Sequence, residues 1–230
     1  QHATAKGHYP GRVTNVGTRT NVSWPTIMLP YIGRNDMWDV FVTGGSPFNY
    51  MPLLVCPSDP PPKLTVAELS YVCNAGLRDH GSVAPYDVPA NGVFHDLSKA
   101  GGTSKVSPAY VAKHDGVSTT LLLSENIDSG TWNLGAEFRI GMTWTLKLNP
   151  GPNDHKRIND DIGGGINWKY ARPSSKHPGG VVVTFCDGHQ FFLSEDIDYL
   201  VNALLLTPHG AGIKNLGAAT VNSAFTGTLL

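Results

Sequence analysis

The chain has 230 residues, enough to bury the core of one large domain or two small ones. Its 17 basic and 18 acidic side chains leave a formal net charge of −1, which argues against nucleic acid or a strongly charged partner. No apolar run approaches the ~20 residues that span a bilayer. The chain begins at Gln1 without Met, so we interpret Gln1 as a boundary. The 26 Gly and 17 Pro residues favour a strand-rich domain with long loops over a helical bundle.

The first half of the chain predicts short elements separated by Gly- and Pro-rich turns. Residues 1–20 are polar, and Ser23 can then cap a short helix with Pro25 in its first turn. A second short helix is predicted over residues 34–42. Strands are predicted over residues 53–56 (LLVC) and 67–76 (AELSYVCNAG), the latter ending at Gly76.

The second half predicts further strands and two short helices. Ser107-Pro108 can start a helix that ends at His114-Asp115-Gly116, followed by a strand over residues 119–125. Alternating apolar residues predict a strand pair within residues 135–148. A Gly- and Asp-rich loop covers residues 151–168, an amphipathic helix ends before Pro208, and residues 212–230 form a small, polar tail.

The stretch HPGGVVVTFCDGHQFF, residues 177–192, predicts a β-hairpin. Asp187-Gly188 between two apolar runs is typical of a two-residue type I′ turn, with positive φ at both residues. That turn pairs Cys186 with His189 and Thr184 with Phe191. Bulky apolar residues on both faces predict a hairpin covered on both sides.

The same stretch begins with His177 and reaches an aspartate ten residues later, which looks like a His–Asp site. The strand between them separates His177 from Asp187 by roughly 20 Å, so the two cannot form a dyad or share a metal. We therefore interpret His177 as a structural residue whose hydrogen bond holds the loop before the strand, with a ligand role as the alternative. The structural motif comprises His177, Pro178, Gly179, Gly180, Asp187 and Gly188.

Other chemical signals are weaker. The strongest cofactor candidate is a calcium site at Asp154, Asn159, Asp160 and Asp161, although the order of an EF-hand is absent. No nucleophile elbow or phosphate-binding loop is present. The three cysteines, Cys56, Cys73 and Cys186, allow either one disulfide with a free thiol or three buried thiols.

Several segments in order carry a family resemblance: WPTIMLPYIG, LLVCPSDP, SYVCNAG, GVF, HDGVSTTLLLSEN and ARPSSKHPGG. Together with His177 to Gly188, the chain resembles the pilin-like proteins of planctomycetes that have a C-terminal H-x9-DG signature. The resemblance implies a pseudopilin-like α+β domain, residues 1–230, with an antiparallel sheet, short helices and long Gly/Pro-rich loops. Its N-terminal stem helix would be truncated, with residues 1–20 as a remnant, residues 177–198 as the core hairpin and residues 212–230 as the tail.

The resemblance also has implications for the cysteines. Cys73 and Cys186 stand where small residues are expected in relatives, and their joint appearance suggests a Cys73–Cys186 disulfide.

The function implied by the resemblance is structural. The chain would be a non-enzymatic subunit of a pilin-like filament or type II secretion pseudopilus, with no cofactor unless calcium binds. Its partners would be copies of itself or other pilin-like subunits, and it would contact membrane only through the absent helix. It would be extracellular or periplasmic, at the cell surface, after anchoring in the inner membrane.

Two alternatives remain open. Five Trp residues and many Gly, Asn and Asp loops suggest a module that binds an extracellular glycan or peptide. If Trp132, Trp144 and Trp168 are all buried, this binding-module alternative is excluded. A metal-dependent hydrolase would use His177, His189, His209 or Asp187.

Overall fold

The computed structural model describes residues 1–78, 87–99, 104–145 and 157–215. In chain order, its elements are α1 His2–Lys6, β1 Val13–Val16, β2 Arg19–Ser23, α2 Trp24–Met28, the 3₁₀ turn η1 Leu29–Ile32, α3 Asn35–Val42, η2 Pro52–Leu54, β3 Tyr71–Leu77, α4 Pro108–Lys113, β4 Leu121–Glu125, α5 Glu137–Ile140, β5 Gly141–Trp144, η3 Trp168–Tyr170, β6 Gly180–Phe185, β7 Gln190–Ser194, α6 Tyr199–Leu205 and η4 Gly210–Asn215. The predicted α+β class is confirmed. No helix in the described part of the chain is long and apolar enough to cross a membrane.

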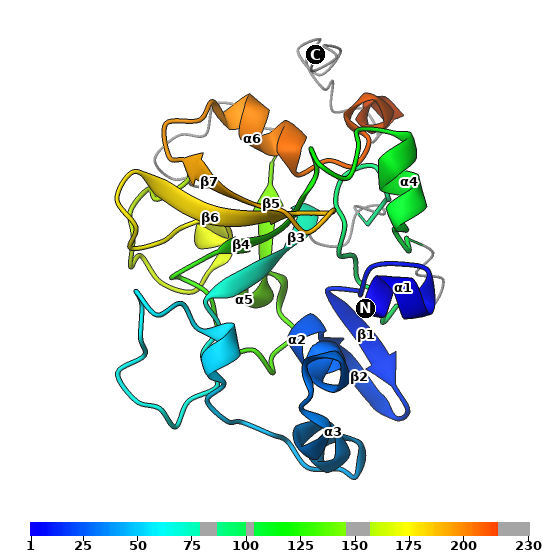
Figure 1. Ribbon diagram of the computed structural model, residues 1–230, viewed down its shortest axis with the longest axis vertical. Helices are drawn as coiled ribbons and strands as arrows, with labels where there is room; N and C mark the ends of the chain where they lie inside the picture. Colours follow the sequence, from blue (N-terminus) through cyan, green and yellow to red (C-terminus); the bar gives the residue numbers. More distant parts are fainter. Residues whose placement is uncertain (79–86, 100–103, 146–156, 216–230) are drawn as a thin grey trace.

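A five-stranded sheet in the order β5-β3-β4-β6-β7 forms the centre of the molecule (Figure 1). Neighbouring strands are antiparallel except β5, which runs parallel to β3. The expectation of a wholly antiparallel sheet is therefore wrong at one edge. Residues 137–140, predicted as strand, form the helical turn α5, which redirects the chain so that β5 enters the sheet beside β3 in the same direction.

Helices cover both faces of this sheet, so the central strands are buried on both sides. Trp24 of α2 packs in one apolar cluster with Cys73 of β3. Tyr199 and Ala203 of α6 pack in the other with Val181 of β6. Figure 1 shows α6 on one side of the sheet and α2 on the other. This two-sided burial explains why the sequences of the central strands are nearly continuous apolar runs.

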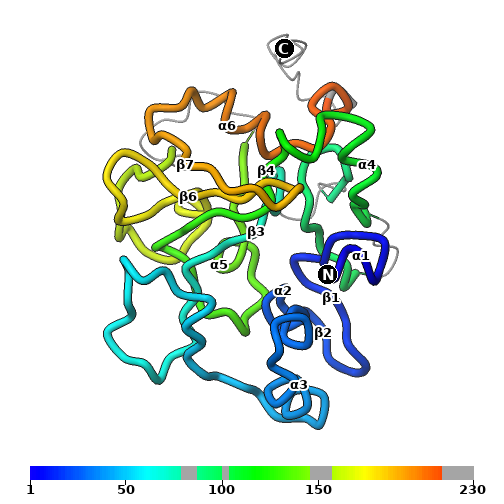
Figure 2. The backbone as a smooth tube through the Cα atoms, viewed as in Figure 1, coloured from blue at the N-terminus to red at the C-terminus, as the bar shows by residue number. Residues whose placement is uncertain are grey.

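The segment between α3 and β3, blue to cyan in Figure 2, runs outside the sheet and carries η2. Residues 53–56 were predicted as a strand, but Pro52–Leu54 form a 3₁₀ turn instead. The predictions of helices at α3 and α4, and of strands at β3 and β4, are confirmed.

The β6–β7 hairpin has a different turn from the one predicted. Val182 pairs with Phe192 and Thr184 with Gln190, one residue out of the expected register. Phe185 and His189 close a three-residue loop, in which Gly188 has a φ of 92° while Asp187 does not have positive φ. This is a type I turn followed by a left-handed glycine, the second common way to close a hairpin.

The expectation that the hairpin is covered on both sides is also wrong. Among the described residues, β7 is an edge strand with no further strand beside it. Phe191 and Phe192 are 56% and 48% exposed. The hairpin therefore has a buried first strand and a partly open second one.

The suggested Cys73–Cys186 disulfide is not formed, because all three cysteines are free thiols. Cys73 lies on β3 level with Leu123 of β4, and Cys186 donates its backbone N–H to Thr120 on the far side of β4. One strand thus separates them, which alone places their backbones at least roughly 9–10 Å apart, and they are also offset by three residues along β4. A disulfide needs Cα atoms within about 7 Å.

Candidate functional site

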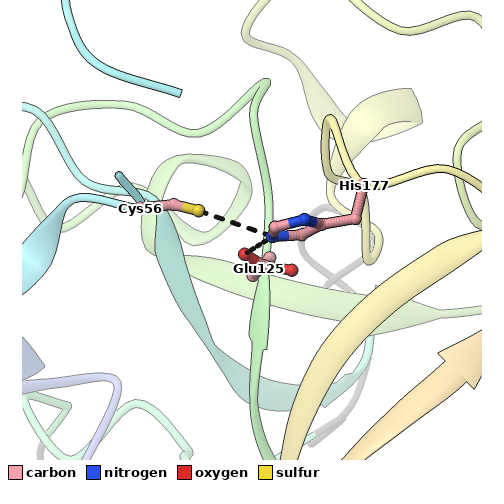
Figure 3. A group of neighbouring side chains, drawn as sticks. All are labelled: Cys56, Glu125 and His177. Atoms are coloured by element: carbon pink, nitrogen blue, oxygen red, sulfur yellow. Dashed lines mark hydrogen bonds and ion pairs between the residues drawn. The ribbon is translucent and has the colours of Figure 1, made fainter. Parts of the chain in front are cut away.

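Three side chains from distant parts of the sequence converge beside the sheet: Cys56, Glu125 and His177 (Figure 3). Cys56 follows η2, Glu125 ends β4, and His177 precedes β6. Nε2 of His177 lies 3.7 Å from Sγ of Cys56 and 3.2 Å from Oε1 of Glu125. Within the described ranges, this is the one group of three or more His, Cys, Asp or Glu side chains close enough to hold a metal ion.

The fold fixes Glu125 most firmly of the three. Its side chain is 4% exposed, and its Oε2 accepts a hydrogen bond of 2.8 Å from the backbone N–H of Val182. The carboxylate therefore ties the end of β4 to the start of β6 in addition to the strand pairing. A buried carboxylate needs such partners, because an unpaired one is costly to remove from water.

The loop before β6 positions His177. Oγ of Ser175 accepts the His177 backbone N–H at 3.0 Å and donates to the Gly180 carbonyl at 2.7 Å. Gly179, with a φ of 81°, then turns the chain into β6. The imidazole of His177 lies within hydrogen-bond distance of Glu125, and the structural role of His177 stays a prediction.

Cys56 does not have the character of an activated thiol. Burial, followed by its hydrogen bond to Glu125, raises the pKa of the Cys56 thiol, while hydrogen bonds from Ser58 act in the opposite direction. Nucleophilic cysteines instead have lowered pKa values. The geometry also differs from a catalytic relay, in which the imidazole uses one nitrogen for the nucleophile and the other for the acid. Here the same Nε2 faces both Cys56 and Glu125.

A cavity of about 500 Å³ opens beside these residues. The His177 side chain, 31% exposed, forms part of its wall. The other lining residues include Leu53, Ser58, Tyr71, Thr184 and Gln190. The cavity thus lies next to all three side chains, of which Cys56 and Glu125 are buried and His177 is partly exposed.

A family model described as a protein of unknown function (DUF1559) matches residues 1–200. The chain belongs to the DUF1559 family. No curated protein and no solved structure matches the chain. The matched range takes in Cys56, Glu125, His177 and the β6–β7 hairpin.

A buried ion pair in this DUF1559 chain supports the loop that carries His177. Nη1 of Arg172 lies 3.0 Å from Oδ2 of Asp128, and both side chains are almost completely buried. Arg172 also donates to the carbonyls of Tyr170 and Asp160 and to Oγ of Ser174. This network joins the segment after β4 to the segment before β6.

Other predicted site residues lie elsewhere. His177 precedes β6 and Asp187 follows it, so the two occupy opposite ends of the strand. Asp187 pairs instead with His189, 2.6 Å away in the exposed turn. His209 stacks on His114 with ring centroids 4.0 Å apart. The four residues of the hydrolase alternative therefore occupy three separate places.

The described members of the predicted calcium set have separate hydrogen-bond partners. Asn159 contacts Glu195 and the Ser175 backbone. Asp160 accepts from the Arg157 backbone, and Asp161 accepts from the Tyr170 hydroxyl. Asp154 lies outside the described residues. Calcium binding there stays a prediction.

The tryptophans give limited support to a glycan-binding module. Trp132 and Trp144 are fully buried. Trp168 is half-buried, and the Arg78 guanidinium lies 3.6 Å from its ring centroid. Two of the three rings are closed to a sugar, and a cation covers a face of the third.

Sequence reasoning missed Cys56 and Glu125 as partners of His177. Glu125 lies 52 residues from His177, and Cys56 lies 121 residues away. The available signal was an acidic residue at the end of a strongly apolar strand, where its side chain becomes buried.

Proposed function

We propose that this DUF1559 chain is the outward-facing domain of a pilin-like assembly subunit, without enzymatic activity of its own. A helix preceding Gln1 would anchor it in the inner membrane and pack in a filament or secretion pseudopilus. Its partners would be copies of itself or other pilin-like subunits, and the domain would lie outside the inner membrane.

The observation that carries the proposal is the geometry of the chain start. The Gln1 carbonyl already accepts a helical hydrogen bond from Ala5, and the helix α1 ends at Gly7 in the left-handed conformation. Ala3 packs against the core cluster that contains Trp24. A preceding helix that continued into α1 would therefore join the domain next to this core cluster.

An apolar groove beside α1 adds support. It has a volume of about 430 Å³, and Gln1 itself lines it. Its other walls include Trp24, Met28, Phe94 and Leu122. A helix arriving at Gln1 would have apolar surface to bury at its point of attachment.

The signature residues also support a scaffold role. His177 contacts Glu125, and the serine before it holds the loop closed. Gly188 provides the left-handed turn that closes the hairpin. These contacts support a role of the signature residues in the architecture of β6 and β7.

The test is negative-stain electron microscopy of full-length protein under conditions in which pilins assemble, with residues 1–230 as the matched control. We expect filaments or short pseudopilus-like rods from the full-length protein and dispersed monomers from the control. Dispersed monomers from both would count against the proposal, and filaments from both would place the assembly contacts in the domain rather than the helix.

A further inference from the structure

The two separations from Nε2 of His177 match those around a tetrahedral metal ion. Typical zinc–ligand bond lengths place a nitrogen and a sulfur ligand roughly 3.6 Å apart, and a nitrogen and an oxygen ligand roughly 3.4 Å apart. The corresponding distances from Nε2 of His177 are 3.7 Å to Cys56 and 3.2 Å to Glu125. All three donor atoms lie within 4.8 Å of one another.

We propose that Cys56, Glu125 and His177 bind one Zn²⁺ ion. Thiolate, imidazole and carboxylate are its protein ligands, and the two anionic ligands balance the charge of the ion. A neutral assembly suits a site in which Cys56 and Glu125 are buried. Hard cations such as Ca²⁺ prefer oxygen ligands, so the thiol and imidazole select against them.

Convergence on one point favours ligation over proton relay. Nε2 of His177 faces both other side chains, so the lone pair of a neutral imidazole is directed toward the space that they share. Deprotonated Cys56 and Glu125 would replace their mutual contact with bonds to the ion. The proton of the Cys56 thiol goes to solvent, as zinc binding to a thiol requires.

Neighbouring groups already orient each donor, which is how metal sites are tuned. Oε2 of Glu125 accepts the Val182 N–H, which leaves Oε1 directed toward His177. Ser175 holds the His177 backbone. Ser58 donates hydrogen bonds to the Cys56 sulfur.

Three protein ligands leave one tetrahedral position for an outside donor. The cavity of about 500 Å³ that these residues line provides access to it. The fourth ligand is therefore water or a small molecule with a carboxylate or thiolate group. Three-ligand zinc sites with a fourth exchangeable position are the arrangement found in catalytic and ligand-exchanging centres rather than in closed structural ones.

The test is titration of untagged, reduced and metal-free protein with Co²⁺, followed by competition with Zn²⁺. We expect one equivalent of Co²⁺, with visible bands typical of tetrahedral coordination and a near-ultraviolet thiolate-to-metal band. Zn²⁺ should abolish both. Addition of acetate or a small thiol should shift the visible bands without removing the thiolate band, because the fourth position exchanges.

The variants Cys56→Ser and His177→Gln should lower Zn²⁺ affinity by about 100-fold or more, beyond what loss of an outer partner costs. Cys186→Ser and His189→Gln are matched controls outside the site and should bind as the unaltered protein does. Circular dichroism reports whether each variant is folded, and Glu125→Gln supplies a third ligand variant if one is not.

Three results would overturn the proposal: less than one equivalent of Co²⁺ bound, a spectrum without the thiolate band, or equal affinity in Cys56→Ser and Cys186→Ser. The spectra require no filament, so failure of the metal site and failure of assembly are separate outcomes.

Discussion

Replacing Arg172 by Met tests whether the buried network behind the His177 loop holds the fold together. The Arg172 and Asp128 side chains are 1% and 2% exposed, and their charged atoms are 3.0 Å apart. Removing one partner of a buried pair leaves an uncompensated charge and costs about 3–5 kcal/mol. At 2–4 °C per kcal/mol for a chain of this size, the melting temperature should fall by roughly 6–20 °C.

The assay is equilibrium unfolding in urea, followed by fluorescence of the buried Trp132 and Trp144. The double variant Arg172→Met/Asp128→Asn should recover part of the loss, because no unpaired charge remains. Lys176→Met is the matched control. Lys176 pairs with Asp59 at 2.6 Å, but its side chain is 54% exposed, so its loss should cost about 0–1 kcal/mol.

A decrease in the free energy of unfolding below about 1 kcal/mol for Arg172→Met would refute the reasoning. Equal decreases for Arg172→Met and Lys176→Met would refute it too. Either result would mean that the ion pair is as open to water as the surface one.

Three further predictions concern the thiols, acid stability and strand pairing. In protein purified under oxidising conditions and then unfolded, Ellman's reagent should titrate three thiols, whereas a Cys73–Cys186 disulfide would leave one. In folded protein at pH 8, Cys186 should react slowly, because burial raises the pKa of its thiol to about 12. Burial, and then the neighbouring charge of His114, lower the pKa of His209. The unfolded chain therefore binds a proton at this histidine more readily than the folded chain does. The free energy of unfolding should fall as the pH drops through about 6.5 and below. The urea midpoint should fall between pH 7.5 and 5.5, and by less in His209→Gln; the same slope in both would contradict this origin. Gly180→Ala should cost about 1–3 kcal/mol, because its Cβ would collide with the carbonyl of Leu193 on β7, and an unchanged urea midpoint would contradict the observed register.

The class of fold could be predicted because it depends on local patterns. The apolar runs at β3, β4 and β6, and the caps of the short helices, are readable from neighbouring residues. The α5 turn could not be predicted from neighbouring residues, since Phe138, Ile140 and Met142 alternate as in a strand. The helical turn over residues 137–140 is selected by its packing against β3 and β5, which no local pattern records.

The hairpin illustrates a finer limit. Asp187-Gly188 gave the position of the turn but not its type, because a glycine with positive φ occurs in both two-residue and three-residue hairpin loops. The two choices differ by one residue in register, and the sheet context decides between them. The acidic end of the apolar strand β4 could have indicated that Glu125 is buried, but no local pattern shows its contact with Cys56 and His177. That contact depends on how β4, β6 and the outer loop are placed together.

The residues that precede Gln1 in the full-length protein test the proposed assembly role most directly. Its coding sequence, together with N-terminal sequencing and intact mass of the mature form, would determine them. The account predicts a short basic leader, removed in the mature protein, and then an apolar helix of about 20 residues with glutamate at its fifth position, running into α1. A secretory signal cleaved just before Gln1, or a second folded domain in place of the helix, would contradict it.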